Sequence, residues 1–166
     1  MTDIYSYLLL DGALWAEDME LARQSGAPYR SLFRGKPAEE LNNVAPYLFS
    51  VSDREDFEKW VNAREQKDPV ARRTVRLTSN LDLDELRKHL RRFLRVKREN
   101  GSFLYYRYYD PKVIACTLPN LTEEQLIEFF SGIFEITHFS DVLHEKRTYT
   151  CSNGELNIDV EPDYKI

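Results

Sequence analysis

Residues 81–111 read LDLDELRKHLRRFLRVKRENGSFLYYRYYDP and carry the clearest pattern of regular structure in the chain. In the first half of this stretch, apolar residues recur at spacings of three and four, which predicts an amphipathic helix over about 81–96. The apolar stripe consists of Leu83, Leu86, Leu90, Phe93 and Leu94. Asn100-Gly101 then ends the helix, and the aromatic run over 103–109 predicts a strand.

The face of the predicted helix opposite its apolar stripe is cationic. Its bases are Arg87, Lys88, Arg91, Arg92 and Arg95, with Lys97 and Arg98 just beyond. Residues 69–98 hold ten Lys or Arg and three Asp or Glu, although the whole chain has a net charge of −5. This distribution indicates either an electrostatic partner site or an internal ion-paired layer, and a solvated helix face is the simplest explanation.

The aromatic strand contains an unusual arginine. Strand alternation places four residues on one face, namely Phe103, Tyr105, Arg107 and Tyr109. An arginine among so many aromatic rings is costly to bury alone, so we expect Arg107 to have a carboxylate or aromatic partner. Tyrosine and arginine are also common anchors of protein interfaces. Asp110 and Pro111 follow, and they predict a helix N-cap and the first helical position.

Strands and helices also alternate in the rest of the chain. Asp11-Gly12 marks a turn after an apolar first strand, and Pro46 begins a later strand. Strands are predicted over residues 4–10, 29–33, 46–51 and 74–78, and as two or three pieces over 134–160. Helices are predicted over residues 16–24, 37–41, 54–65 and 111–118, and after the capping box at 122–125. This alternation predicts a mixed α/β (α+β) single domain over residues 1–166, with one central sheet flanked by helices.

No motif in the sequence nominates an active site, so we expect a protein that is not an enzyme. Nucleophile-elbow, Walker and dinucleotide-binding motifs are lacking. The histidines, His89, His138 and His144, lack metal-ligand spacing, so neither a metal nor a cofactor is expected. Cys116 lies in an apolar run and is predicted to be buried. With two cysteines and no apolar run of about 20 residues, the chain is expected to work in the cytoplasm and not in a membrane.

Several short motifs occur in an order that resembles a known family. They are Leu10-Asp11-Gly12-Ala13, Ala45-Pro46-Tyr47-Leu48, His89-Leu90-Arg91-Arg92-Phe93-Leu94 and Arg107-Tyr108-Tyr109-Asp110-Pro111, continuing through Leu118-Pro119 and Glu124-Gln125 to Phe129-Phe130. Together they span about residues 5–135, and the run from 89 to 111 is the most specific part. The sequence resembles the effector-chaperone (adaptor) domain of type VI secretion, catalogued as domain of unknown function 4123.

The resemblance implies an adaptor that needs neither catalysis nor a cofactor. Members of the family bind a toxic effector and help to load it onto the valine–glycine repeat spike protein of the contractile secretion apparatus. The implied partners are therefore an effector, the spike, or both. Lys112 stands where the family usually has arginine, and the acidic, strand-like tail over 136–166 stands where many members have a helical lobe.

Two groups of candidate residues follow. Seven are candidate partner contacts: Arg87, Arg91, Arg92, Arg95, Tyr105, Arg107 and Tyr109. Five are expected to hold the fold: Asp11, Gly12, Pro46, Asp110 and Pro111.

An immunity protein that silences a toxin is the alternative function. A nucleic-acid binder that uses the basic helix over 87–98 is the weaker alternative, because the chain is acidic, with a pI of about 5.3.

Overall fold

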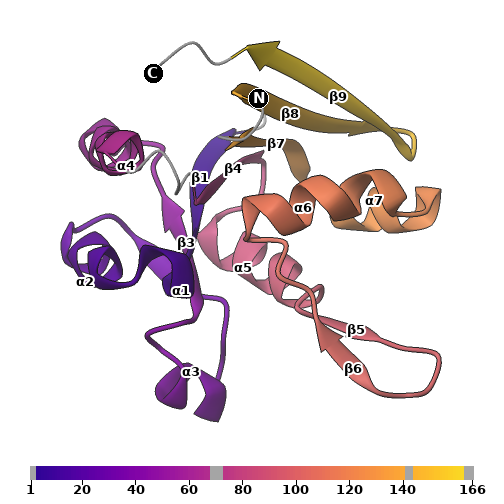
Figure 1. The fold of residues 1–166 in the computed structure, drawn as a ribbon, viewed down its shortest axis with the longest axis horizontal. Coiled ribbons are helices and arrows are strands. Elements are labelled where there is room, and N and C mark those ends of the chain that lie inside the picture. The colour runs from indigo at the N-terminus through magenta and orange to yellow at the C-terminus, as the bar shows by residue number, and fades with distance from the viewer. Residues whose placement is uncertain (1–2, 68–72, 141–143, 163–166) are drawn as a thin grey trace.

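The computed structural model describes residues 3–67, 73–140 and 144–162, and Figure 1 shows the order of its elements. The first half forms β1 (Tyr5–Asp11), α1 (Gly12–Trp15), α2 (Glu17–Gln24), β2 (Tyr29–Ser31), α3 (Lys36–Glu40), β3 (Pro46–Ser50), α4 (Glu55–Lys67) and β4 (Thr74–Ser79). The second half forms α5 (Leu83–Arg91), β5 (Arg95–Lys97), β6 (Phe103–Tyr105), α6 (Pro111–Thr117), the 3-10 turn η1 (Leu118–Asn120), α7 (Glu123–Phe129), β7 (Ile133–Ser140), β8 (Glu145–Ser152) and β9 (Glu155–Pro162). The predicted mixed α/β class is confirmed.

One antiparallel sheet organises the molecule. Its strand order is β2-β3-β1-β4-β7-β8-β9, and each neighbouring pair is antiparallel. β1 lies in the interior of this sheet, and its Leu8, Leu9 and Leu10 are all buried. The nearly continuous apolar run of β1 is thus explained by burial on both faces of the sheet.

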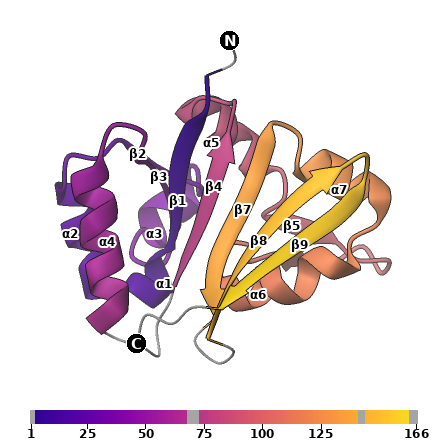
Figure 2. The same ribbon diagram turned by 90° about the horizontal axis from the view of Figure 1, so that it is seen from above.

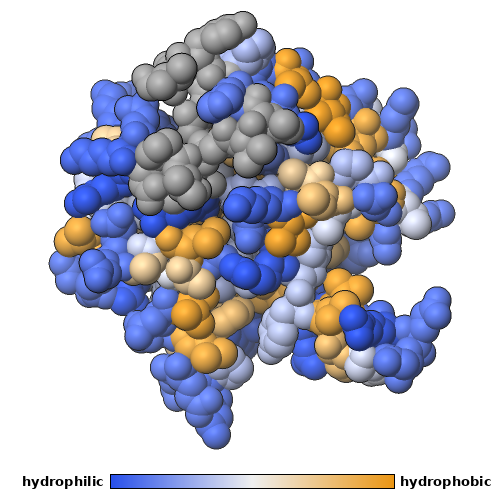
Figure 3. Space-filling model, in the orientation of Figure 1, coloured by the Kyte–Doolittle hydropathy of each residue, from blue (hydrophilic) through white to orange (hydrophobic). Residues whose placement is uncertain are grey.

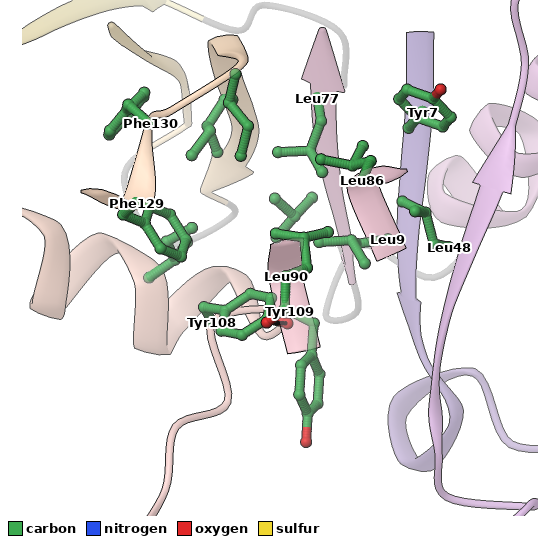
Figure 4. Packing of buried hydrophobic residues seen from close by; sticks show 14 of the residues in the cluster. Tyr7, Leu9, Leu48, Leu77, Leu86, Leu90, Tyr108, Tyr109, Phe129 and Phe130 are labelled. Atoms are coloured by element: carbon green, nitrogen blue, oxygen red, sulfur yellow. Dashed lines mark hydrogen bonds between the residues drawn. The ribbon is translucent and has the colours of Figure 1, made fainter. Parts of the chain in front are cut away.

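Helices cover the two faces of the sheet in different places (Figure 2). On one face, α1, α2 and α4 enclose a first core that includes Leu8, Leu10 and Trp15. On the other face, α5, α6 and α7 enclose a second core, in which Leu9 of β1 packs near Leu86 and Leu90 of α5 (Figure 4). Alternate residues of β1 therefore contribute to both cores.

Side chains cap the three helices α5, α6 and α7. Asp82 accepts hydrogen bonds from the second and third backbone amides of α5 and forms a capping box with Glu85. Asp110 accepts from the Lys112 amide at 2.9 Å and caps α6, as predicted. The predicted capping box of α7, which consists of Thr122 and Gln125, is also confirmed. Each cap satisfies an amide that the helix itself leaves without a partner.

The predicted boundaries around residues 81–109 are wrong. The helix ends at Arg91 instead of about Val96, and the strand predicted over 103–109 includes only 103–105. Residues 95–105 form the β5–β6 hairpin instead, so the basic segment over 87–98 is not one helix. Hairpin pairing prevails because the Asn100-Gly101 turn, with Gly101 at φ +83°, folds the chain back on itself.

The aromatic alternation and the burial of Cys116 are also wrong predictions. Tyr108 and Tyr109 are both buried, because the chain has left the strand and turned into the N-terminus of α6. Cys116 is exposed, because Ile114 of α6 and Leu118 of η1 point into the core, whereas Cys116 lies on the outer face of α6.

The predicted strands after residue 134 are present as β7, β8 and β9, with a turn at Asn153-Gly154. Of the tail predicted over 136–166, residues 141–143 and 163–166 lie outside the described residues. Within the described part of the chain, no helix is both long enough and apolar enough to cross a membrane.

Candidate functional site

The β5–β6 hairpin projects from the rest of the molecule and exposes large apolar side chains (Figure 1). Val96, Phe103, Leu104 and Tyr105 are exposed to 47%, 54%, 45% and 66%. Figure 3 shows hydrophobic atoms beside hydrophilic ones where the hairpin protrudes. Because a cluster of exposed apolar side chains is a common mark of an interaction surface, we take this hairpin as the candidate site.

Local hydrogen bonds determine the shape of the hairpin. The Gly101 amide donates to the Arg98 carbonyl oxygen at 2.9 Å, and the Arg98 amide donates to that of Ser102 at 2.8 Å. The Asn100 side chain also accepts from the Ser102 amide at 3.0 Å. A type I turn followed by a glycine with positive φ is a common three-residue hairpin loop. The tip is therefore a defined turn.

The base of the hairpin is attached to the second core. Leu94, which directly precedes β5, is buried, and its carbonyl oxygen accepts from the Tyr106 amide at 2.9 Å. The Tyr106 hydroxyl is 2.6 Å from Oγ1 of Thr117 in α6. The two strands thus leave the core from fixed positions.

The two faces of the hairpin differ in chemistry. Val96 lies opposite Leu104, and these two side chains make an aliphatic face. The other face, which we call the cation–aromatic face, carries Arg95, Lys97, Phe103 and Tyr105. The Arg95 guanidinium lies 4.2 Å from the centroid of the Phe103 ring. Among the described residues, no ion pair involves the cations at 95, 97 and 98, so their charge is available to a partner.

Two of the predicted partner contacts instead hold α5 against the strand β2 and the loop after it. Arg87 Nε donates to the Ser31 carbonyl oxygen at 2.7 Å, and Arg91 Nε donates to that of Leu32 at 2.9 Å. Burial lowers the pKa of Arg87, and repulsion from Arg91 adds to the effect. Charge reversal at Arg91 would therefore disturb the fold as well as any interface.

Arg107 joins two helix starts. It forms an ion pair with Asp11, whose other oxygen accepts from the Ala13 amide at 2.9 Å and caps α1. Asp110, the cap of α6, lies 3.9 Å from the same guanidinium group. Hydrogen bonding and attraction by Asp11 raise the pKa of Arg107, although partial burial opposes them. The expected carboxylate partner of Arg107 is present, and its role here is to connect α1 to α6.

Tyr109 lies among these charged groups and is buried. Its ring centroid is 5.9 Å from the Arg107 guanidinium, and burial together with the nearby Asp11 raises its pKa. The adjacent Tyr108 is buried in the second core, where its hydroxyl donates to the Leu90 carbonyl oxygen at 2.7 Å (Figure 4). Neither tyrosine is an exposed contact.

The motif residues Gly12 and Pro46 lie where the start of α1 approaches the start of β3 closely. A Cβ on Gly12 would lie 2.5 Å from the Ala45 carbonyl oxygen, to which the Gly12 amide donates at 3.0 Å. Pro46 opens β3 opposite Asp11, and its carbonyl oxygen accepts from the Leu32 amide at 2.9 Å. Only glycine fits this approach between α1 and the start of β3.

The structure therefore divides the predicted contact residues. Arg92, Arg95 and Tyr105 are exposed near or on the hairpin, whereas Arg87, Arg91, Arg107 and Tyr109 serve internal contacts. The sequence interpretation missed Val96, Phe103 and Leu104 as exposed apolar contacts. The signal that could have identified them is Asn-Gly flanked by short β-prone runs, which is typical of a hairpin.

These features define a layered α/β protein whose most prominent surface is a projecting hairpin. Among the residues described, no group of three or more His, Cys, Asp or Glu could hold a metal ion. Residues 6–128, which include α5, the hairpin and α6, match the family model described as Domain of unknown function (DUF4123). The chain belongs to this family. Neither a curated protein nor a solved structure matches it.

Proposed function

We propose that this chain is a non-catalytic, cytoplasmic adaptor of type VI secretion that binds a toxic effector, the spike protein, or both. The observation that carries the proposal is the exposed β5–β6 hairpin, which presents apolar side chains together with the cations at 95, 97 and 98, none of which has an ion pair among the described residues. The chain belongs to the DUF4123 family. The sequence motifs resemble the effector adaptors of this family, and this resemblance supports the same role.

The hairpin has the composition of a small interface. Phe103 and Tyr105 would act as aromatic anchors that a partner pocket covers, because interface energy concentrates in such residues. The cations at 95, 97 and 98 would form the rim and attract an acidic segment, which raises the association rate more than the affinity. An acidic, partly apolar segment of the effector or the spike would fit this surface.

The experiment is affinity purification of the tagged full-length chain from its native bacterium, followed by mass spectrometry. The test variant combines Phe103→Ala with Tyr105→Ala, and the matched control is Ile127→Ala, an exposed apolar residue on α7. We expect the original chain and the control to recover an effector or the spike protein, and the hairpin variant to lose it.

Three outcomes would contradict the proposal. Recovery of nucleic acid, with salt-sensitive retention on heparin, would favour the nucleic-acid binder. Recovery of a toxin that stays inactive in the complex and becomes active only without this chain would favour an immunity protein. Equal recovery of the partner by the hairpin variant would remove the hairpin from the interface.

A further inference from the structure

The strand β9 forms one edge of the sheet and is as long as the two strands before it, β7 and β8 (Figure 2). Its eight residues pair with β8 in a continuous register from Glu155 to Pro162, without a bulge. Proteins commonly shorten, bend or cover such edges, because an edge strand presents unpaired backbone groups to other chains. An edge of this length without a bulge is a template for another strand.

The turn before β9 determines which backbone groups point outward. Asn153 and Gly154 have φ values of 52° and 81°, as in a two-residue type I′ turn, so Ser152 and Glu155 are the hydrogen-bonded pair that closes it. Hydrogen-bonded pairs alternate along an antiparallel ladder. The amide and carbonyl groups of Leu156, Ile158 and Val160 therefore point away from β8.

The side chains of β9 alternate in character between the two faces of the sheet. Ile158 lies opposite Tyr149, a residue of the second core, and Leu156 packs against that core. Ile158 and Val160 remain 43% and 48% exposed at the edge. The other face of β9 carries Glu155, Asn157, Asp159 and Glu161.

We propose that the edge of β9 binds an extended segment of another protein in which Lys or Arg alternates with apolar residues. The apolar residues of that segment would cover Ile158 and Val160, and its cations would lie beside the acidic residues of β9. Glu161 already pairs with Lys146 at 3.2 Å, whereas Glu155 and Asp159 have no ion pair within the described ranges. Two carboxylates are thus open to an incoming cation.

A second copy of the chain fits this edge poorly. A two-fold antiparallel pairing centred on Ile158 would set Glu161 against Glu155 of the other copy. A shift by one pair in either direction would set Asp159 against Asp159, or Asp159 against Glu155. Like charges opposite each other destabilise strand pairs, so the acidic face selects a basic strand instead of a copy of itself.

The edge of β9 is separate from the β5–β6 hairpin: in Figure 1, β9 lies at the top and the hairpin at the bottom right. The inference does not depend on the proposed adaptor function. A failure to recover an effector in the purification above would leave it intact.

The test uses the full-length chain and a fluorescent eight-residue peptide in which lysine alternates with valine. One control peptide alternates glutamate with valine. A second control has the lysine–valine composition in two blocks, which keeps the charge but removes the alternation. We expect saturable binding, measured by fluorescence anisotropy, of the alternating lysine peptide only. Equal binding of the block peptide would indicate charge attraction alone and would overturn the proposal.

Variants locate the binding at the β9 edge. Ile158→Pro removes an outward amide without removing a hydrogen bond to β8, and Ile158→Ala is the matched control that keeps this amide. We expect Ile158→Pro to weaken binding about tenfold and Ile158→Ala to weaken it less. Unchanged binding by the proline variant would overturn the proposal, as would a dimer of the original chain that the proline variant abolishes in sedimentation.

Charge reversal supplies a test that does not depend on tolerance of proline. Asp159 is exposed, so Asp159→Lys is expected to fold, which circular dichroism checks. This variant should lose affinity for the lysine–valine peptide and gain affinity for the glutamate–valine peptide. If its preference between the two peptides does not change, the acidic face of β9 does not select the partner.

Discussion

At the scale of single residues, the arginines of this protein differ by what their guanidinium groups contact. Arg87 and Arg91 donate to backbone carbonyl oxygens, and Arg107 pairs with a buried aspartate. Arg95 stacks on an exposed aromatic ring. The residue type is the same in each case, so composition and spacing cannot assign these roles.

The pair between Arg107 and Asp11 gives a stability prediction. Arg107→Ala leaves the buried Asp11 carboxylate with the Ala13 amide but without its cation. We expect the free energy of unfolding to fall by about 1–3 kcal/mol, because an unpaired buried polar group is costly. Urea unfolding measures this change. Arg95→Ala, on the exposed hairpin, is the control and should stay within about 0.5 kcal/mol; similar losses in both variants would contradict the assignment.

Two buried histidines make stability depend on pH. Burial lowers the pKa of His89 and of His138, and repulsion from Arg92 and Arg147, respectively, acts in the same direction. The unfolded chain, whose histidines have a pKa of about 6.5, therefore binds protons at a higher pH than the folded chain does. Below this pH the free energy of unfolding falls, by at most about 1.4 kcal/mol per pH unit for each histidine.

Urea unfolding between pH 7.5 and 5 tests this dependence. We expect stability to decrease toward pH 5, and His138→Gln to reduce the slope by removing one of the two groups. His144→Asn is the matched control, because His144 is exposed, and asparagine tolerates its positive φ of 48°. A slope that His144→Asn removes and His138→Gln leaves unchanged would contradict the role of burial.

At the scale of elements, turn chemistry prevails over helical periodicity between residues 92 and 105. Phe93 and Leu94 continue the apolar stripe of α5, which is why the sequence predicts a longer helix. The hairpin forms instead because β5 and β6 pair with each other across the Asn100-Gly101 turn. Helical periodicity describes one continuous segment, so it cannot predict that two separate segments pair as strands.

Gly101→Ala should therefore open the hairpin without unfolding the protein. Alanine at a φ of +83° costs about 1–2 kcal/mol, which is comparable with the stability of an isolated two-stranded hairpin. We expect faster amide hydrogen exchange in β5 and β6 and unchanged exchange in β1. Gly35→Ala, at a φ of +65° in another loop, is the control. Faster exchange throughout the sheet would contradict the local character of this element.

At the scale of the whole molecule, the two cores share their central strand. Leu8 and Leu10 point into the first core, and Leu9 points into the second. A loss of packing on one face of β1 therefore affects the residues that support the other face. The sheet should make both cores unfold together.

Leu9→Ala tests this coupling. It should lower the free energy of unfolding by about 2–5 kcal/mol, as large-to-small changes in a buried site do. Trp15 and Trp60 both lie in or against the first core, so their fluorescence reports on the core that does not contain Leu9. We expect fluorescence and far-ultraviolet circular dichroism to show the same shifted urea midpoint. An unshifted fluorescence transition would mean that the two cores unfold independently.

Much of the fold could be predicted because it depends on neighbouring residues. The caps at Asp110 and Thr122 contact amides two or three residues away, and the continuous apolar run of β1 indicates that this strand is buried on both faces. The candidate site was predicted less well. Arg95 and Tyr105 lie on the exposed hairpin, whereas Arg91 and Tyr109 do not.

Local sequence was thus sufficient for the mixed α/β class, most strand and helix positions, and the caps. Tertiary structure alone determined the strand order, the hairpin as a projecting surface, the exposed edge at β9 and the contacts of each arginine. The physical reason is the distance along the chain: Arg107 is 96 residues from Asp11, and Arg87 is 56 residues from Ser31. Side chains so far apart in sequence come into contact only when the sheet brings them together, and a periodic pattern in the sequence does not predict such contacts.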